Sequence, residues 1–149
     1  MFLAKKSIIA GIIALMVPAC ESNIVRYDIP DSYVDISVYL SDPSSFNLTV
    51  VGGSLWMPNE GYGGVLIYRR YYNQAFDDFA AYELACPTHW ADGCGTLEHT
   101  AGSLYITCPC PDGHTYQVFD GQSTDTNHVL PVKEYTASFD GINLLTVVN

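Results

Sequence analysis

The feature that most constrains the fold of this chain is a pair of short segments, rich in cysteine and histidine, within residues 86–121. The first segment begins CPTH and the second reads CPCPDGH. Two such segments joined by a strand-like run predict either a metal site or a disulfide framework, because cysteine and histidine serve in metal sites and paired cysteines form disulfides. The cysteine and histidine residues of the two segments are Cys86, His89, Cys94, Cys108, Cys110 and His114.

Residues 1–19 are predicted to be an export signal that is not part of the fold. Lys5 and Lys6 precede an apolar run at 8–17, which is too short to span a bilayer but is typical of a signal peptide. The VPAC sequence that ends at Cys20 resembles the lipobox of bacterial lipoproteins, whose cysteine becomes the acylated first residue. The resemblance implies an exported lipoprotein, anchored through Cys20 to a membrane of the bacterial cell envelope. The alternative is an ordinary secretory signal that leaves Cys20 as a free thiol.

The remaining chain is predicted to be one exported domain on a short tether. Residues 20–32 show no periodicity and are expected to link Cys20 to a domain at 33–149. An oxidising compartment would permit disulfides among its cysteines. The formal net charge is −10 with only six basic residues, which argues against nucleic acid as a partner. The expected partners are therefore the membrane, through the lipid anchor, and an unidentified protein.

The domain is predicted to be all-β. Alternating apolar residues at 33–40 predict a half-buried strand, and the apolar run at 65–68 predicts a central strand that is buried on both faces. Short strands separated by Gly- and Pro-rich turns, without a long amphipathic helix, indicate a small antiparallel barrel or sandwich. Further strands are expected at 46–51, 79–84, 104–107 and 114–119, and a closing hairpin at 134–139 and 144–148.

The succession of strand, Cys/His loop, strand, CPC loop, strand and closing hairpin resembles a Rieske-type iron–sulfur domain over nearly all of residues 33–149. The segment GGSLWMPNEGYGGVLIYR is also similar to Rieske-like lipoproteins of Bacteroidetes-type bacteria. The resemblance implies a [2Fe–2S] cluster held by two thiolates and two imidazoles, and a disulfide between the two remaining loop cysteines. The implied cluster ligands are Cys86, His89, Cys108 and His114, and the implied disulfide joins Cys94 to Cys110.

The histidine spacing departs from the family pattern in both loops. Thr88 is an extra residue before His89, and Pro111, which cannot bind a metal, stands where the family has its second histidine ligand. The signal also lacks the arginine pair behind which exported Rieske proteins generally travel folded. We therefore expect a domain without a cluster, with a further disulfide between Cys86 and Cys108, that serves as an interaction module and not as an enzyme. The alternatives are a [2Fe–2S] one-electron carrier and a zinc site in the same loops.

Residues outside the two loops give weaker functional signals, and no catalytic residue is assigned. The adjacent carboxylates of Asp77 and Asp78 are expected to face solvent, and His99 and His128 are expected to be surface residues. Four aromatic residues around a Gly-rich segment at 59–64 are candidates for an exposed binding patch. They are Trp56, Tyr62, Tyr71 and Tyr72.

Overall fold

The computed structural model describes residues 27–73, 77–126 and 129–149. The predicted signal segment, Cys20 and His128 therefore lie outside the described residues. Within these three ranges the chain forms β-strands and one short 3₁₀ helix, so the all-β prediction is confirmed. Among the same residues, no helix is long and apolar enough to cross a lipid bilayer.

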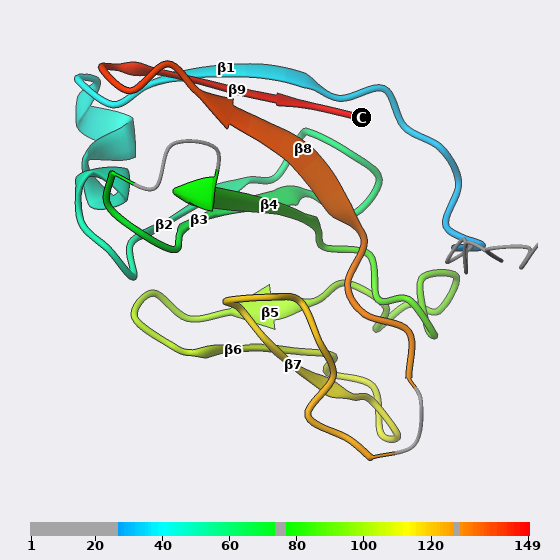
Figure 1. The fold of residues 1–149 in the computed structure, drawn as a ribbon. Helices are drawn as coiled ribbons and strands as arrows, with labels where there is room; N and C mark the ends of the chain where they lie inside the picture. Colours follow the sequence, from blue (N-terminus) through cyan, green and yellow to red (C-terminus); the bar gives the residue numbers. More distant parts are fainter. Residues whose placement is uncertain (1–26, 74–76, 127–128) are drawn as a thin grey trace, which may run out of the picture.

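The larger sheet is antiparallel and has the strand order β1–β9–β8–β4–β3–β2. Figure 1 shows it as the upper part of the molecule, curled into a half-barrel. β8 pairs with β9 along most of its length but with β4 at only two positions, which lets the sheet bend there. Its strands are β1 (Asp35–Tyr39), β2 (Ser54–Met57), β3 (Val65–Arg69), β4 (Phe79–Glu83), β8 (Glu134–Phe139) and β9 (Leu144–Val148).

A smaller antiparallel sheet lies below the first in Figure 1 and consists of β5 (Glu98–His99), β6 (Tyr105–Thr107) and β7 (Thr115–Gln117). One hydrophobic core fills the curl of the larger sheet, and a second lies between the two sheets. β3 contributes to both, because Ile67 faces the curl while Leu66 faces the smaller sheet. This position between two cores explains the uninterrupted apolar run at 65–68 and confirms the predicted central strand.

The predicted strand at 46–51 is wrong, because residues 46–49 belong to the 3₁₀ helix η1 (Pro43–Thr49) and residues 50–51 to the turn that follows it. Pro43 stands in the first turn of η1, where its fixed φ suits a helix and its missing N–H costs nothing. The Ser45 hydroxyl donates to the carbonyl oxygen of Tyr39 (2.5 Å) and so ties the helix to the end of β1. The predicted hairpin at 134–139 and 144–148 is confirmed as β8 and β9.

The described part of the predicted tether, residues 27–32, lies against the domain. Ile29 is buried, and the Tyr27 hydroxyl donates to the carbonyl oxygen of Val132 at 3.5 Å. Asp31 is 3.5 Å from the Lys133 ammonium group. The packed domain therefore begins at least four residues before the predicted boundary at residue 33, at Ile29.

Candidate metal centre

Two loops between strands carry the cysteine and histidine residues. The first leaves β4 and closes through the hydrogen bond from Cys86 N to Gly95 O (2.8 Å). The second runs from β6 to β7 and closes through the bond from Cys108 N to His114 O (2.9 Å). Gly95 has no room for a side chain, because a Cβ there would overlap the carbonyl of the first loop's histidine. Both loops are therefore fixed by backbone contacts at their bases.

Cys86, His89 and Cys108 converge at one point between the loops. Their ligand atoms all lie within 4.8 Å of one another, and Cys86 and Cys108 are buried free thiols. The Nδ1 atom of His89 is 3.6 Å from the Cys86 sulfur and 3.7 Å from the Cys108 sulfur. Two thiols and one imidazole at this separation can hold a metal ion.

His89 is oriented by contacts on both ring nitrogens. Its Nε2 lies 3.2 Å from a carboxylate oxygen of Asp112, and its Nδ1 lies 2.9 Å from the Thr88 hydroxyl. A proton on Nε2, donated to Asp112, leaves the Nδ1 lone pair directed toward the two sulfurs. A carboxylate behind a ligating histidine is a common arrangement in metal sites, because it fixes the tautomer and the ring orientation.

The two thiols differ in acidity. Burial opposes ionisation of Cys86, but hydrogen bonds with the Cys108 and Thr88 side chains outweigh it and lower the pKa of Cys86 to about 7. Burial, followed by the neighbouring Cys86, raises the pKa of Cys108 to about 11. The hydrogen bond with Cys86 raises the pKa of His89. Cys86 can therefore ionise to a thiolate near neutral pH, and a bound metal cation would favour ionisation of Cys108 as well.

Tyr116 on β7 places a buried hydroxyl beside the thiols. Burial, followed by the nearby Cys86, raises the pKa of Tyr116, so this hydroxyl keeps its proton. Its oxygen has no hydrogen-bond partner among the described residues. A metal-bound thiolate at Cys86 would accept that proton in a hydrogen bond, so the environment of Tyr116 fits a site that holds ligated sulfur.

The disulfide implied by the resemblance is present. Cys94 of the first loop and Cys110 of the second are bonded, with their Cα atoms 5.3 Å apart. The further disulfide expected between Cys86 and Cys108 is not formed, since both are free thiols. Each of the two sulfurs instead lies close to Nδ1 of His89, at 3.6 Å for Cys86 and 3.7 Å for Cys108.

His114 lies at the same end of the molecule but outside the compact group. Its ring centre is 6.4 Å from that of His89, and its Nδ1 is 2.7 Å from an Asp125 carboxylate oxygen. The structure therefore brings three of the four sequence-predicted ligands together and places the fourth beside them. The extra residues after Cys110 account for this offset, because they carry His114 to the end of the second loop.

A residue that the sequence analysis missed supports the first loop from below. Glu83 at the end of β4 is fully buried, and its carboxylate accepts hydrogen bonds from Gly63 N (2.7 Å) and Ala85 N (2.9 Å). It also accepts from Tyr62 N (2.8 Å) and the Tyr135 hydroxyl (2.6 Å). The sequence signal for this role was a single glutamate inside an otherwise apolar strand, because a buried carboxylate requires hydrogen-bond donors around it.

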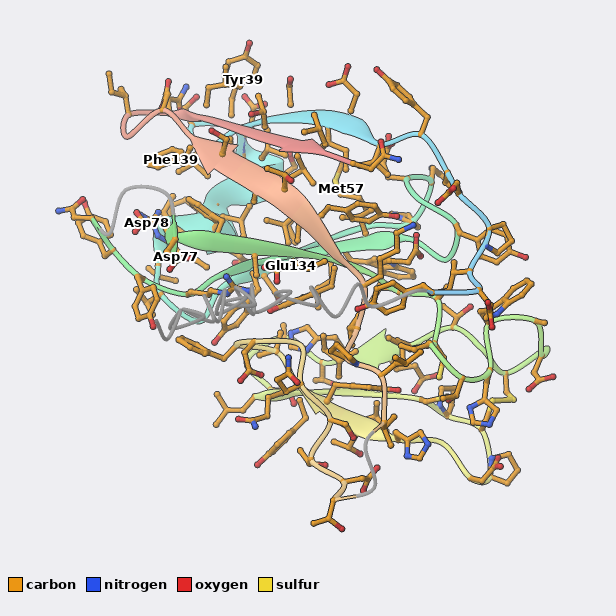
Figure 2. The ribbon with its side chains drawn as sticks, turned by 45° about the vertical axis from the view of Figure 1, so that its right-hand side comes forward. Tyr39, Met57, Asp77, Asp78, Glu134 and Phe139 are labelled. Carbon is orange, nitrogen blue, oxygen red and sulfur yellow. A yellow bond between two sulfur atoms is a disulfide. The ribbon has the colours of Figure 1, made fainter. Side chains whose placement is uncertain are left out.

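Two of the weaker predictions are wrong. Asp77 is exposed, but Asp78 is buried and lies 3.3 Å from the guanidinium of Arg69, which is also buried (Figure 2). β4 begins beside this ion pair, so the second carboxylate turns inward. His99 is half-buried, because it alternates with the exposed Glu98 along β5 and so points inward.

The four candidate aromatic residues are exposed, but their ring contacts lie in different places. Tyr62 packs edge-to-face on Trp90 beside the first loop, whereas Tyr71 packs on Phe119. Tyr72 lies over the guanidinium of Arg69. The predicted single patch is therefore not formed by these contacts.

Comparison with known proteins adds no family assignment. Neither a protein-family model nor a curated protein matches this chain.

Proposed function

We propose that the two loops hold a Rieske-type [2Fe–2S] cluster and that the protein is a membrane-anchored one-electron carrier. Cys86 and Cys108 serve as the thiolate ligands, and His89 and His114 as the imidazole ligands. The observation that carries the proposal is the pair of buried free thiols between the two loops, with two histidine rings, 6.4 Å apart at their centres, beside them. The cluster-free module expected from the sequence would pair these two thiols in a disulfide, whereas a cluster requires both of them free, as they are here.

The residues around the site support this assignment. The Cys94–Cys110 disulfide joins the two loops in the pairing that the Rieske resemblance implies. Tyr116 offers a buried hydroxyl to the Cys86 sulfur, and His114 supplies a second imidazole close to the first. To act as a ligand, the His114 side chain would leave Asp125 and turn toward His89.

The chain's own residues would control electron transfer in three ways. When bound, the cluster supplies a one-electron couple whose potential is raised by its two imidazole ligands. A hydrogen bond from the Tyr116 hydroxyl to a ligated Cys86 thiolate would withdraw charge from the sulfur and raise the potential further. Asp112 holds the proton on the outer nitrogen of His89, and this ring is only partly buried, so a docked partner protein can approach it.

A single tetrahedral ion is the second candidate, and one observation favours it. An ion with metal–sulfur and metal–nitrogen bonds of about 2.3 Å and 2.0 Å would hold these atoms about 3.5 Å apart. The distances from His89 Nδ1 to the two sulfurs are 3.6 and 3.7 Å. A zinc ion held by Cys86, His89 and Cys108 would leave its fourth position to His114 or to a water molecule.

The deciding experiment is metal and sulfide analysis of the protein isolated from its native compartment, with absorption and EPR spectra. We expect about two irons and two acid-labile sulfides per chain and a rhombic EPR signal after reduction. About one zinc per chain, with no colour, would establish the single-ion site instead. A metal-free protein without free thiols among Cys86 and Cys108 would contradict both.

Matched variants assign the ligands. His89→Ala is expected to remove the cluster signal while the domain stays folded. His99→Ala serves as the control, because His99 lies outside both loops and should leave the signal unchanged. If His114→Ala leaves the iron content and the EPR signal unchanged, His114 is not a ligand.

A further inference from the structure

The two loops of the candidate metal centre share one outer face, at the end of the molecule opposite η1 (Figure 1). The rings of His89 and His114 lie at the middle of this face, with their centres 6.4 Å apart. A carboxylate oxygen of Asp112 lies 3.2 Å from Nε2 of His89. A carboxylate oxygen of Asp125 lies 2.7 Å from Nδ1 of His114. We call this surface the histidine face and define it by Tyr62, His89, Trp90, Asp112, His114 and Asp125.

The carboxylates of the histidine face are exposed and are not neutralised by a described lysine or arginine. The Asp112 side chain is 84 % exposed and that of Asp125 is 44 % exposed. Asp92, at the rim in the turn that begins at His89, is also exposed. The lysine and arginine residues within the described ranges all pair with carboxylates outside this face. These pairs are Arg69 with Asp78, Arg70 with Asp77 and Glu134, and Lys133 with Asp31.

Ligation of the two histidines would leave this negative charge in place. A metal-bound imidazole is neutral, so His89 would only donate its outer N–H to Asp112. The His114 ring would turn away from Asp125 and leave that carboxylate to solvent. A negative face repels nucleic acid and anionic lipid, and it attracts a protein that carries lysine and arginine on its surface.

Tyr62 gives the histidine face an exposed aromatic residue that is held in place. Its side chain packs edge-to-face on the half-buried Trp90, with the ring centres 5.8 Å apart, and the residue is 48 % exposed. The backbone N–H of Tyr62 donates to the buried carboxylate of Glu83 at 2.8 Å. Tyrosine and tryptophan are among the residues that contribute most to binding at protein interfaces, because a rigid ring buries a large area at a small entropic cost.

We propose that the histidine face docks a one-electron carrier protein that has a basic surface. Lysine and arginine side chains of that partner meet the carboxylates of Asp92, Asp112 and Asp125, and an apolar part of its surface packs on Tyr62. The carboxylates steer the partner and accelerate its encounter, whereas the aromatic contact supplies affinity. The partner's role as an electron carrier rests on the proposed function, while its basic character rests on the charges of this face alone.

Stopped-flow oxidation of the reduced, metal-loaded protein by two matched acceptors tests the proposal. Native cytochrome c has a basic surface, and succinylated cytochrome c has its lysine charges reversed around the same haem. One electron passes from the reduced protein to the ferric haem, and no bond forms or breaks. We expect native cytochrome c to react at least about tenfold faster at about 0.01 M salt. The two rates should converge at about 1 M salt, where charges are screened beyond about 3 Å. Equal rates at low salt would overturn the proposal.

NMR titration of the metal-free protein with ferrous cytochrome c measures docking without electron transfer. Trp90 belongs to the histidine face and Trp56 lies on β2, so their indole N–H signals serve as probe and internal control. We expect the Trp90 signal to shift at low salt and the Trp56 signal to stay in place. An unmoved Trp90 signal would overturn the docking proposal, whether or not electrons are transferred. A shifted Trp90 signal without electron transfer would support the basic partner and contradict the electron-carrier proposal.

Matched variants locate the contact. Asp92→Asn removes one charge at the rim and should slow the reaction with native cytochrome c about threefold at low salt, but not at high salt. Tyr62→Ala should weaken binding about tenfold at both salt concentrations. Asp42→Asn is the control, because it removes the same charge at the start of η1, at the opposite end of the molecule (Figure 1). Equal losses in Asp92→Asn and Asp42→Asn would show that the net charge alone attracts the acceptor, and would overturn the proposal.

Discussion

At the scale of single residues, the buried carboxylate of Glu83 organises the surroundings of the candidate metal centre. It joins the Gly-rich segment 59–64, the root of the first loop and β8 through hydrogen bonds from Tyr62, Gly63, Ala85 and Tyr135. Burial, followed by this carboxylate, raises the pKa of Tyr135, which therefore remains a donor. This buried carboxylate is stabilised by converging N–H and O–H groups.

Glu83→Gln should destabilise the domain by about 3 kcal/mol, because the amide NH₂ would face donors where a carboxylate oxygen now accepts. Urea unfolding followed by circular dichroism measures the change. Glu98→Gln, on the exposed side of β5, is the matched control and should change stability by less than about 0.5 kcal/mol. A loss in Glu83→Gln no larger than in the control would contradict the assigned role.

Cys94→Ser should lower the free energy of unfolding by about 3 kcal/mol, since the disulfide closes a span of 16 residues. A thiol reductant should destabilise the wild-type protein by a similar amount and have no effect on the variant. The comparison is made by urea unfolding of metal-free protein with and without the reductant. An effect of the reductant on the double variant Cys94→Ser/Cys110→Ser would reveal a Cys86–Cys108 disulfide and oppose the electron-carrier proposal.

At the scale of elements, the β8–β9 hairpin depends on one aspartate in its turn. The Asp140 carboxylate accepts from the backbone N–H groups of Ile142 (2.8 Å), Asn143 (2.8 Å) and Leu144 (3.0 Å). These bonds lower the pKa of Asp140 below its ordinary value of 3.8. The stabilisation by these bonds is therefore complete above pH 3.8, and it is lost as the pH falls through the lower pKa that Asp140 has in the folded state.

Asp140→Ala should lower the melting temperature at pH 7, and the difference from the wild type should shrink below about pH 3.8, where the carboxyl becomes protonated. Asp140→Asn retains an oxygen acceptor and should have the smaller effect at pH 7. Thermal melts from pH 2 to 7 make the comparison. A difference between Asp140→Ala and the wild type that is independent of pH would show that the charge is not involved.

At the scale of the whole molecule, the two sheets share one core and one charged bridge. Leu66 and Tyr82 from the larger sheet and Ile106 and Tyr116 from the smaller belong to the same buried cluster. Arg70 spans the sheets, donating to Phe119 O (2.6 Å) and to Glu134 Oε1 (2.5 Å), and Figure 2 labels Glu134 at the start of β8. The sheets should therefore unfold together.

Ile106→Ala should destabilise the whole domain by about 3 kcal/mol, because it leaves a cavity in the shared core. Two variants each keep one tryptophan as a fluorescent probe. Trp56→Phe keeps Trp90, which reports on the first loop, and Trp90→Phe keeps Trp56, which reports on β2. Their fluorescence transitions in urea should coincide, before and after the Ile106 substitution. Two separate transitions would show that the sheets fold independently.

The sequence by itself determined the fold class and most of the strands. Strict alternation at 33–40, the apolar run at 65–68 and the hairpin around Asp140 are local patterns, and each specifies a strand or a turn without distant contacts. The segment at 46–51 misled, because its apolar residues suit a strand, whereas Pro43 and the contact of Ser45 with the end of β1 stabilise η1.

The sequence also singled out the cysteines and histidines, but only the tertiary structure decided how they combine. Cys86 and Cys108 lie 22 residues apart, and their state depends on how β4, β6 and β7 bring the two loops together. The same packing placed the His99 ring against the carbonyl oxygen of Tyr105 and buried Asp78 beside Arg69. Such contacts join residues that are distant in sequence, so no local pattern encodes them.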